Sequence, residues 1–298
     1  MEKLKEVRNY LVIHNGNIQT QQIQDHIEIN ENNIIIYDST QLQIIYTSNE
    51  CQLFNVFIDI KKNINVDLIE IYQLQNQSQY QKEINIEQNS HVTRYVENDC
   101  LDGQYILHDH VQVGQDASID CAYVELSNYS TKSKMKYDLN KPGARALVRL
   151  ASLASNEKKK EYQISLCHHA PNTYGDMDNY GVVKSHSSLI IDGIGKIEKG
   201  NYQSDTHQTN KIIVFDDGCI AEANPYLYID EYDVKASHGA SVGKIDEDHL
   251  YYLQSRGLTK QDAMHLVTYG YFLPVLNFIH VDSLKDRFNE VLKEKVGL

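Results

Sequence analysis

From about residue 10 to about residue 235, the chain consists of short runs of β-branched and aromatic residues separated by polar turns. Examples are NIIIY at residues 33–37, LQIIY at 42–46 and FNVFIDI at 54–60. Such runs recur every ten residues or so, which is typical of consecutive strands. Strands begin within about the first ten residues. No helical pattern of ten to fifteen residues alternates with them, so the pattern argues against an α/β fold.

The later runs favour a parallel β-helix over a β-sandwich. Short apolar segments at residues 187–191, 211–215 and 227–229 stand beside expected turns at 192–193 and 217–218. They return at intervals of loosely twenty residues, as the coils of a solenoid would. The fold class expected from the pattern is therefore mainly β, a parallel solenoid.

The pattern changes after Gly243 and predicts three helices. Asp246 can cap a first helix that ends at Arg256 and Gly257, and Thr259 with Asp262 resembles a capping box. The second helix should bury one face and break at Pro274. That face is Ala263, Leu266, Val267 and Gly270.

A third amphipathic stripe predicts the last helix, which starts near Ser283 and ends near Gly297. Its apolar positions are Leu284, Phe288, Val291 and Leu292. We expect a β-helix core over residues 1–245 and a small C-terminal helical segment over 246–298. The segment should pack on the end of the β body, because no flexible linker precedes it.

Charge and composition exclude several classes of function. The 298 residues include 28 Lys and Arg against 41 Asp and Glu, a formal charge of -13. Such a chain is repelled by nucleic acid and by anionic membrane surfaces. No apolar run is long enough for a signal peptide or a membrane span, so we expect a cytosolic protein.

Familiar catalytic motifs are absent from the sequence. It contains no Gly-rich phosphate loop, no G-x-S-x-G, no H-E-x-x-H and no C-x-x-C pair. We therefore expect a protein that is not an enzyme. The five cysteines are expected to be reduced thiols and not a zinc site. They are Cys51, Cys100, Cys121, Cys167 and Cys219.

Two weak metal candidates stand out. The segment Cys167-His168-His169 offers a thiolate and imidazoles, and on a strand Cys167 and His169 face the same side. Such a segment alone is more often packing and surface than a metal site. His186 and His207 are 21 residues apart and would stack on neighbouring coils of that length, although two exposed polar residues are the more common explanation. We expect no tightly bound metal.

His238 is the best single site candidate. It lies in SHGASVG at residues 237–243, where small neighbours allow a partner to approach closely. An imidazole there can bind metal or transfer protons, and it can equally hydrogen-bond the turn at the end of the sheet. The residue types alone leave both readings open.

Three linked motifs follow one another near the C-terminus: DVKASHGASVG at residues 233–243, YLQSRG at 252–257 and QDA at 261–263. Together they resemble the C-terminal signature of the SufB/SufD family, and of its SufD branch in particular. Upstream, SDTHQTN at 204–210 and EANP at 222–225 are similar to the approach to the family's final coil. The likeness covers roughly residues 165–275.

The resemblance implies a right-handed parallel β-helix and a scaffold role in SUF-type iron–sulfur cluster assembly. It implies pairing with a SufB-type subunit or with itself through the β-helix, and docking of a SufC-type ATPase on the C-terminal helices. The docking candidates are Arg256, Gly257, Asp262, His265 and Tyr269. His238 matches the family histidine at the dimer interface, where a transient iron–sulfur cluster is the only cofactor implied.

Two positions depart from the family pattern. Many SufD sequences carry a cysteine two residues before the histidine, where this chain has Ala236. The cysteine that SufB contributes would fall near Asn210. This chain therefore resembles the SufD-type partner.

Two rival functions belong to other classes. A β-helical carbohydrate-binding or carbohydrate-active protein would need clustered carboxylates, for which Asp176 and Asp178 are the place to look. A purely structural oligomerisation module would bind no ATPase and load no cluster.

Overall fold

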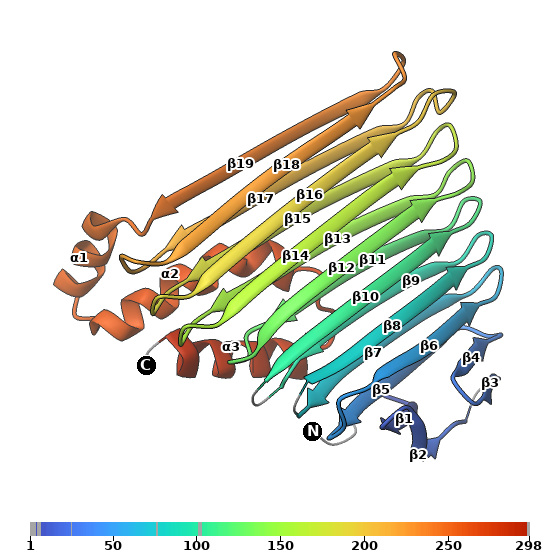
Figure 1. The fold of residues 1–298 in the computed structure, drawn as a ribbon, viewed down its shortest axis with the longest axis horizontal. Coiled ribbons are helices and arrows are strands. Elements are labelled where there is room, and N and C mark those ends of the chain that lie inside the picture. The colour runs from blue at the N-terminus through green and yellow to red at the C-terminus, as the bar shows by residue number, and fades with distance from the viewer. Residues whose placement is uncertain (1–3, 5–6, 25, 76, 101–102, 297–298) are drawn as a thin grey trace.

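The computed structural model describes residues 4, 7–24, 26–75, 77–100 and 103–296. The chain winds into a parallel β-solenoid of about 7 turns whose coils contribute strands alternately to two facing sheets (Figure 1). In sheet order, the ten-stranded sheet contains β19 (Lys235–Lys244), β17 (Asp205–Val214), β15 (Tyr174–Val183), β13 (Arg145–Ala154), β11 (Ser118–Glu125), β9 (His91–Asn98), β7 (Asn65–Leu74), β5 (Thr40–Ser48), β1 (Asn9–His14) and β2 (Asn17–Gln22).

The nine-stranded sheet faces it across the core. Its order is β18 (Ile220–Ile229), β16 (Ser188–Ile197), β14 (Lys159–His168), β12 (Ser130–Leu139), β10 (Gln104–Val113), β8 (Gln77–Ile86), β6 (Leu53–Ile60), β4 (Asn33–Ile36) and β3 (Ile27–Asn30). Alternate side chains of most strands are buried between the sheets, as in β8 and β16. The alternating pattern therefore predicted the strands correctly, because each strand buries one face.

The predicted coil length of about twenty residues is wrong. Equivalent positions on neighbouring coils are 26 residues apart near the N-terminus, as for Asn63 and Asn89. They are 31 apart near the C-terminus, as for Asn179 and Asn210. Each coil holds two strands of up to 10 residues and two turns, which a twenty-residue repeat cannot contain.

One predicted turn is also wrong. Asp192 and Gly193 lie in the middle of β16, whereas Gly218 does form a turn with φ of +81°. Gly193 faces the solenoid interior, where a Cβ atom would lie 2.5 Å from Gln208 Oε1. The glycine therefore makes room for a polar side chain and does not reverse the chain.

The two ends of the solenoid differ. At the N-terminal end the outermost strands are antiparallel hairpins, because β1 pairs with β2 and β3 pairs with β4. At the C-terminal end β18 and β19 are edge strands, each paired on one side only. β2 and β3 are edge strands too, but they are short, and their Ile18, Ile27 and Ile29 pack against the core. We therefore call the N-terminal end closed and the C-terminal end, with its two ten-residue edge strands, open.

Three helices follow the last strand: α1 (Glu247–Ser255), α2 (Lys260–Leu276) and α3 (Asp282–Val296). Asp246 caps α1 by accepting from the backbone N–H groups of Asp248 and His249. Thr259 Oγ1 accepts from Asp262 N at 3.1 Å at the start of α2. Both predicted caps are confirmed. No helix among these described residues is long and apolar enough to span a membrane.

The helices pack on the side of the solenoid. The expectation from the sequence that they pack on its end is therefore wrong. Apolar residues of α2 and α3 form a second core with the outer face of the ten-stranded sheet, and in Figure 1 these helices lie partly behind the strands. This core includes Ile71, Val124, Leu153, Val182, Phe272, Leu276, Leu284, Phe288 and Leu292. The division into two units at residue 245 stays a prediction.

The predicted buried face of α2 is largely wrong. Ala263 is buried, but Leu266 and Gly270 are exposed. The buried residues are Ala263, Thr268, Phe272, Val275 and Leu276. The helix continues through Pro274 to Leu276, because packing on the sheet compensates for the one hydrogen bond that proline cannot donate.

An ionic network crosses the solenoid interior between the early coils. Arg94 Nε donates to Glu70 Oε2 at 2.6 Å, and Arg94 Nη1 donates to Asp109 Oδ2 at 2.5 Å. Lys82 donates to the other oxygen of Glu70, and Tyr123 donates to Asp109. Both cations and Glu70 are fully buried, so each charge depends on its partners for solvation.

Candidate functional site at the open end of the solenoid

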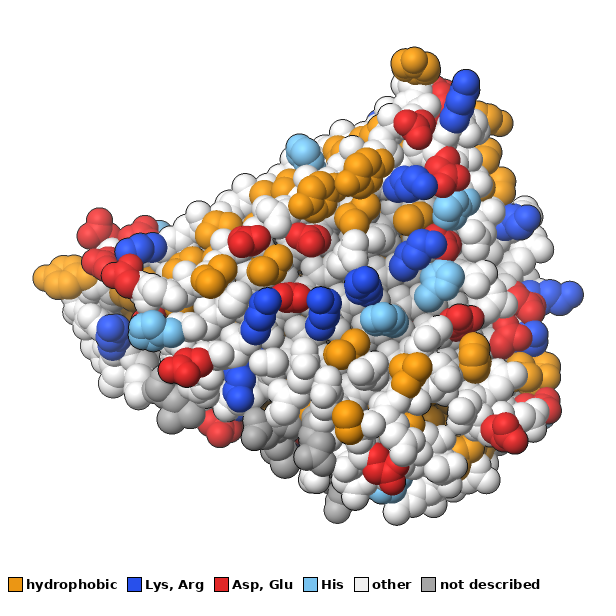
Figure 2. All heavy atoms as spheres, in the orientation of Figure 1, with side chains coloured by type: hydrophobic (Ala, Val, Ile, Leu, Met, Phe, Trp, Pro, Cys, Tyr) orange, Lys and Arg blue, Asp and Glu red, His pale blue; other side chains and the backbone are white. Residues whose placement is uncertain are grey.

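The terminal coil, which we define as β18 and β19, is the least covered part of the solenoid. All ten residues of β19 are exposed, whereas alternate residues of β17 are buried. Figure 2 shows apolar side chains over the last strands, and Ile220, Tyr226 and Tyr228 of β18 are exposed. Edge strands also present unpaired N–H and C=O groups, so the terminal coil is suited to adding strands from a partner.

His238 lies on the interior-facing side of β19. Parallel pairing places it in register with Gln208, which is one of the buried positions of β17. Its inward neighbours Ala236 and Ala240 are small, and a Cβ atom at Gly239 would meet no atom within 4 Å. The imidazole is therefore open to a partner that covers the coil.

A layer of buried amides lies one coil below His238. Asn179 Nδ2 donates to Asn210 Oδ1 at 2.8 Å, and Gln208 Nε2 donates to the carbonyl of Tyr226 at 2.8 Å. The oxygens Asn179 Oδ1 and Gln208 Oε1 are buried and accept no hydrogen bond from the described atoms. Unpaired buried acceptors are uncommon and mark this layer as a place for a donor or a cation.

The terminal coil offers nitrogen and oxygen atoms as metal ligands but no thiolate. Residues 220–244 contain His238 and no cysteine. The nearest thiol in sequence, Cys219, is partly buried against the core in the turn before β18. Iron–sulfur clusters are held mainly by thiolates, so a cluster at this end would need cysteines from another chain.

The helix residues singled out from the sequence lie around α1 and the first half of α2. Arg256 is exposed and its guanidinium lies 5.2 Å from the Tyr252 ring, while Gly257 adopts a φ of +100° after the helix. His265 Nε2 lies 2.9 Å from Asn289 Oδ1 of α3, and the ring of His265 is 6.1 Å from that of Tyr269.

Asp262 has a structural partner of its own. Its carboxylate accepts from Thr259 Oγ1 at 2.6 Å, which keeps it in the capping box. Leu266 and Leu273 are exposed, a pair of large apolar side chains on α2 that the sequence did not single out as surface. Their spacing of seven residues places them on the same face of the helix and could have indicated a shared exposed apolar face.

The expected stacking of His186 and His207 is wrong. His207 lies in β17 and contacts Ser237 Oγ at 2.6 Å and Asp205 Oδ1 at 2.7 Å. His186 lies in the turn before β16, beside Gly218 on the next coil. The longer coil explains the error, since 21 residues do not complete one turn of the solenoid.

The carbohydrate hypothesis depended on Asp176 and Asp178. Both form ion pairs with Arg149. Arg149 Nη2 donates to Asp176 Oδ2 at 2.5 Å, and Arg149 Nε lies 3.3 Å from Asp178 Oδ2. The guanidinium also stacks 4.8 Å from the Phe278 ring at the end of α2. Both carboxylates therefore neutralise a structural arginine instead of facing a substrate.

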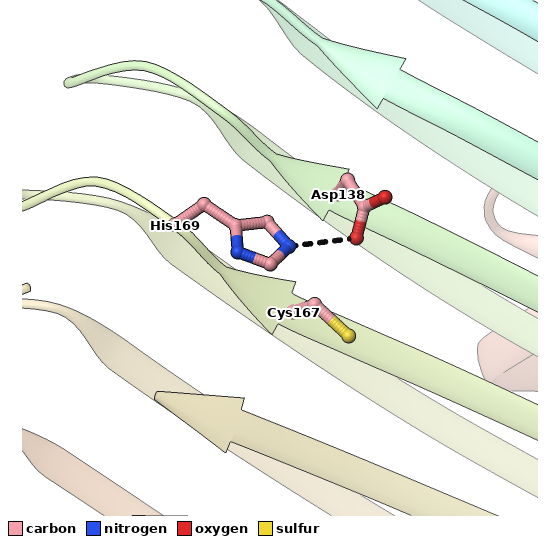
Figure 3. A group of neighbouring side chains, drawn as sticks. All are labelled: Asp138, Cys167 and His169. Atoms are coloured by element: carbon pink, nitrogen blue, oxygen red, sulfur yellow. Dashed lines mark hydrogen bonds and ion pairs between the residues drawn. The ribbon is translucent and has the colours of Figure 1, made fainter. Parts of the chain in front are cut away.

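The segment around Cys167 brings together a group that the sequence did not predict. Cys167 and His169 do face the same side and His168 the other, since His168 is fully buried and contacts Thr173 Oγ1 at 2.7 Å. Asp138 of β12 pairs in register with Cys167 and completes a cluster with His169 (Figure 3). The register between neighbouring coils brings Asp138 beside Cys167. The predicted coil length of about twenty residues was too short to place these two residues side by side.

Comparison with known proteins gives a consistent result. Residues 43–271 match the family model described as SUF system FeS cluster assembly, SufBD core domain. The iron–sulfur cluster assembly protein SufD of Bacillus subtilis is 33% identical over 183 residues, which cover 61% of this chain and 42% of that protein.

Two further relatives match shorter segments. SufD of Escherichia coli is 28% identical over 106 residues, 36% of this chain and 25% of that protein. SufB of Bacillus subtilis is 27% identical over 156 residues, 49% of this chain and 32% of that protein. In each case the match covers less than half of the relative's length.

Proposed function

Because the chain belongs to the SufBD core family of SUF-system iron–sulfur cluster assembly proteins, we propose that it is a SufD-like scaffold subunit that pairs through its open terminal coil. The partner is a SufB-type subunit or a second copy of this chain. The single observation that carries the proposal is the contrast between the two ends: short antiparallel hairpins cap one, whereas the other has two ten-residue edge strands, with every residue of β19 exposed.

Unpaired backbone groups and exposed apolar side chains of the terminal coil both favour pairing with another chain. An edge strand exposed along its whole length invites pairing with another strand, and natural proteins usually cover or charge such edges. Between its terminal Lys235 and Lys244, β19 carries only His238, small residues and Val242, which is 47% exposed. A partner that extends both sheets would bury these side chains and pair the free backbone groups.

His238 is the residue that we assign to cluster assembly. It faces the interior side of the terminal coil, beside the buried amide layer of Gln208 and Asn210. In the paired complex this imidazole would lie where both chains meet. It would offer one nitrogen ligand or a proton, while the partner supplies the thiolates that the terminal coil lacks.

The ATPase would dock on the surface formed by α1 and α2. This surface carries Tyr251, Tyr252, Leu266 and Leu273 as exposed apolar side chains, with Arg256 between the helices. Exposed apolar residues gathered on capped helices fit helix-in-groove docking. Of these apolar residues, Leu266 is nearest in sequence to the docking candidates Asp262, His265 and Tyr269.

Matched substitutions test the pairing proposal. Val242→Asp places a carboxylate in the terminal coil, and Phe57→Asp is the control because Phe57 is 43% exposed on β6 near the closed end. Burying an unpaired carboxylate costs several kcal/mol, so Val242→Asp should weaken pairing at least about 100-fold. Phe57→Asp should leave it unchanged.

Analytical ultracentrifugation of the chain alone and with a SufB-type subunit provides the readout. Loss of the self-associated species in Val242→Asp identifies a homodimer, and loss of the mixed species identifies a heterodimer. Undiminished association of the folded Val242→Asp protein would place the interface elsewhere and refute the proposal.

A second matched pair tests ATPase docking. Leu266→Glu changes a residue that is 48% exposed on α2, and Leu53→Glu changes one that is 55% exposed on β6. Leu266→Glu should reduce binding of a SufC-type ATPase in surface plasmon resonance by tenfold or more, since it loses apolar burial of about 1–2 kcal/mol and adds a buried charge. Equal binding by both variants would exclude this surface.

A further inference from the structure

The Asp138, Cys167 and His169 side chains are brought together by the register of two neighbouring strands. Asp138 of β12 is directly opposite Cys167 of β14 in the nine-stranded sheet. The backbone N–H of His169 donates to the carbonyl of Leu139 at 3.0 Å, which continues the ladder beyond β14. The sheet therefore fixes all three backbone positions, and Figure 3 shows the three side chains gathered on the outer side of the sheet.

The three side chains offer the donor types that borderline divalent metals prefer. One carboxylate oxygen, one thiol sulfur and one imidazole nitrogen all lie within 4.8 Å of one another. Ligand atoms of a tetrahedral zinc ion are roughly 3.3–3.7 Å apart, from bond lengths of about 2.0–2.3 Å. His169 Nε2 lies 2.9 Å from Asp138 Oδ1, so a small side-chain movement would admit the ion between them.

The surrounding residues resemble the outer shell of a metal site. The other ring nitrogen of His169, Nδ1, lies 3.4 Å from Glu198 Oε2. When a metal replaces the contact between Nε2 and Asp138, this carboxylate would accept from Nδ1–H and so keep Nε2 as the ligand nitrogen. The second oxygen of Asp138 accepts from His110 Nε2 at 2.6 Å and from Lys136 Nζ at 2.8 Å. The carboxylate is thus held in place by groups outside the ligand set.

We propose that Asp138, Cys167 and His169 form a binding site for a borderline divalent metal ion of the zinc type. The site lies on the outer face of the solenoid and involves no residue of the terminal coil. It goes beyond the scaffold role, and it departs from the expectation, drawn from the sequence, that the protein binds no metal tightly.

The free site holds an ionised carboxylate and a protonated thiol, so metal uptake must displace a proton from Cys167. Burial would raise the pKa of Asp138, but hydrogen bonds from His110, Lys136 and His169 hold it below its usual value, so the carboxylate is ionised. Burial raises the pKa of Cys167 to about 11, so the free site carries a thiol. Metal binding forms the metal–sulfur bond and releases the thiol proton to solvent.

Cobalt titration of the full-length chain tests this site. Co²⁺ serves as the probe, because a thiolate ligand gives a charge-transfer absorption band that oxygen ligands do not. The protein is first treated with chelator and kept reduced. We expect one Co²⁺ per chain with the charge-transfer band, displaced by Zn²⁺.

Substitutions of the ligands distinguish the site from surface binding. Cys167→Ser should abolish the band and weaken binding at least tenfold, and His169→Gln should weaken it similarly. Cys51→Ser is the control, because Cys51 is an exposed thiol outside the cluster. Absence of the band in the unsubstituted protein, or its persistence in Cys167→Ser, would refute the site.

Glu198→Gln keeps the test decisive if Cys167→Ser fails to fold. Glu198 is partly exposed and bonds to Lys196 Nζ at 2.7 Å, so its replacement leaves the sheet intact. Loss of this outer carboxylate should lower Co²⁺ affinity on the order of 10-fold while keeping the band. Unchanged affinity in Glu198→Gln would contradict the role of His169. Val242→Asp, which should disrupt pairing through the terminal coil, should bind Co²⁺ normally.

Discussion

Replacing Arg94 by methionine should strongly destabilise the solenoid. Arg94 is fully buried and bonds to two carboxylates, Glu70 on the neighbouring strand β7 and Asp109 on the facing sheet. Methionine fills a similar volume but provides no charge. The substitution therefore leaves Asp109 with only the Tyr123 hydroxyl, and leaves Glu70 with Lys82 and Tyr46.

The magnitude follows from the cost of an unpaired buried charge. Removing one partner of a buried ion pair typically costs about 3–5 kcal/mol. The free energy of unfolding of a domain is only about 5–15 kcal/mol, so the loss is a large share of it. Adding Asp109→Asn removes the stranded charge and should restore about half or more of the stability. Lys132→Met is the control: this lysine is 53% exposed and 3.3 Å from Glu161, and its loss should cost less than about 1 kcal/mol.

Urea denaturation followed by circular dichroism measures these effects, and pH gives an independent check. Burial alone would raise the pKa of Glu70, but Arg94 and Lys82 lower it to about 2. A carboxylate with a lowered pKa in the folded state stabilises above its unfolded pKa and loses that contribution as pH falls toward 2. The unsubstituted protein should therefore lose stability between about pH 5 and 2. A cost below 1 kcal/mol for Arg94→Met would refute the interpretation.

Three further predictions concern the site, the core and catalysis. His238→Ala should change the free energy of unfolding by less than about 1 kcal/mol, because the side chain is exposed, yet reduce cluster assembly with a SufB-type partner; normal assembly would remove His238 from the mechanism. Gly181→Val should destabilise by about 1–3 kcal/mol or more, because a Cβ atom would lie 2.4 Å from Leu189 Cδ2; an unchanged denaturation midpoint would show that the core yields. The purified chain should not hydrolyse ATP, since it lacks a phosphate loop, and turnover abolished by a substitution in this chain would contradict that.

The strands and helix caps could be predicted from the sequence because local patterns determine them. Alternation along β8 or β16 reports one buried face, and Asp246 and Thr259 cap their helices through neighbours within three residues. The coil length could not be predicted in this way. The turns between strands differ in length. Residues that contact each other on neighbouring coils are therefore 26 positions apart near the N-terminus and 31 near the C-terminus, without a fixed repeat.

The same limit explains what was missed at the candidate sites. His238 was singled out as a candidate because its own segment is distinctive. Gln208 beside it and Asp138 beside Cys167 lie one coil away in sequence, so local patterns do not connect them. The exposed face of α2 was missed for a related reason. Which apolar residues of an amphipathic helix are buried depends on the sheet beneath it, and there Phe272 and Leu276 are buried while Leu266 is not.

Hydrogen–deuterium exchange across β19 tests the pairing of the open end most directly. In the chain alone, the edge N–H groups of β19 and β18 that face away from the solenoid have no strand partner and should exchange quickly. In complex with a SufB-type subunit or in a homodimer, pairing should slow exchange across Lys235–Lys244, with little change in the hairpins β1–β2 and β3–β4 at the closed end. Unchanged exchange in β18 and β19 on complex formation, with new protection elsewhere on the chain, would contradict the account.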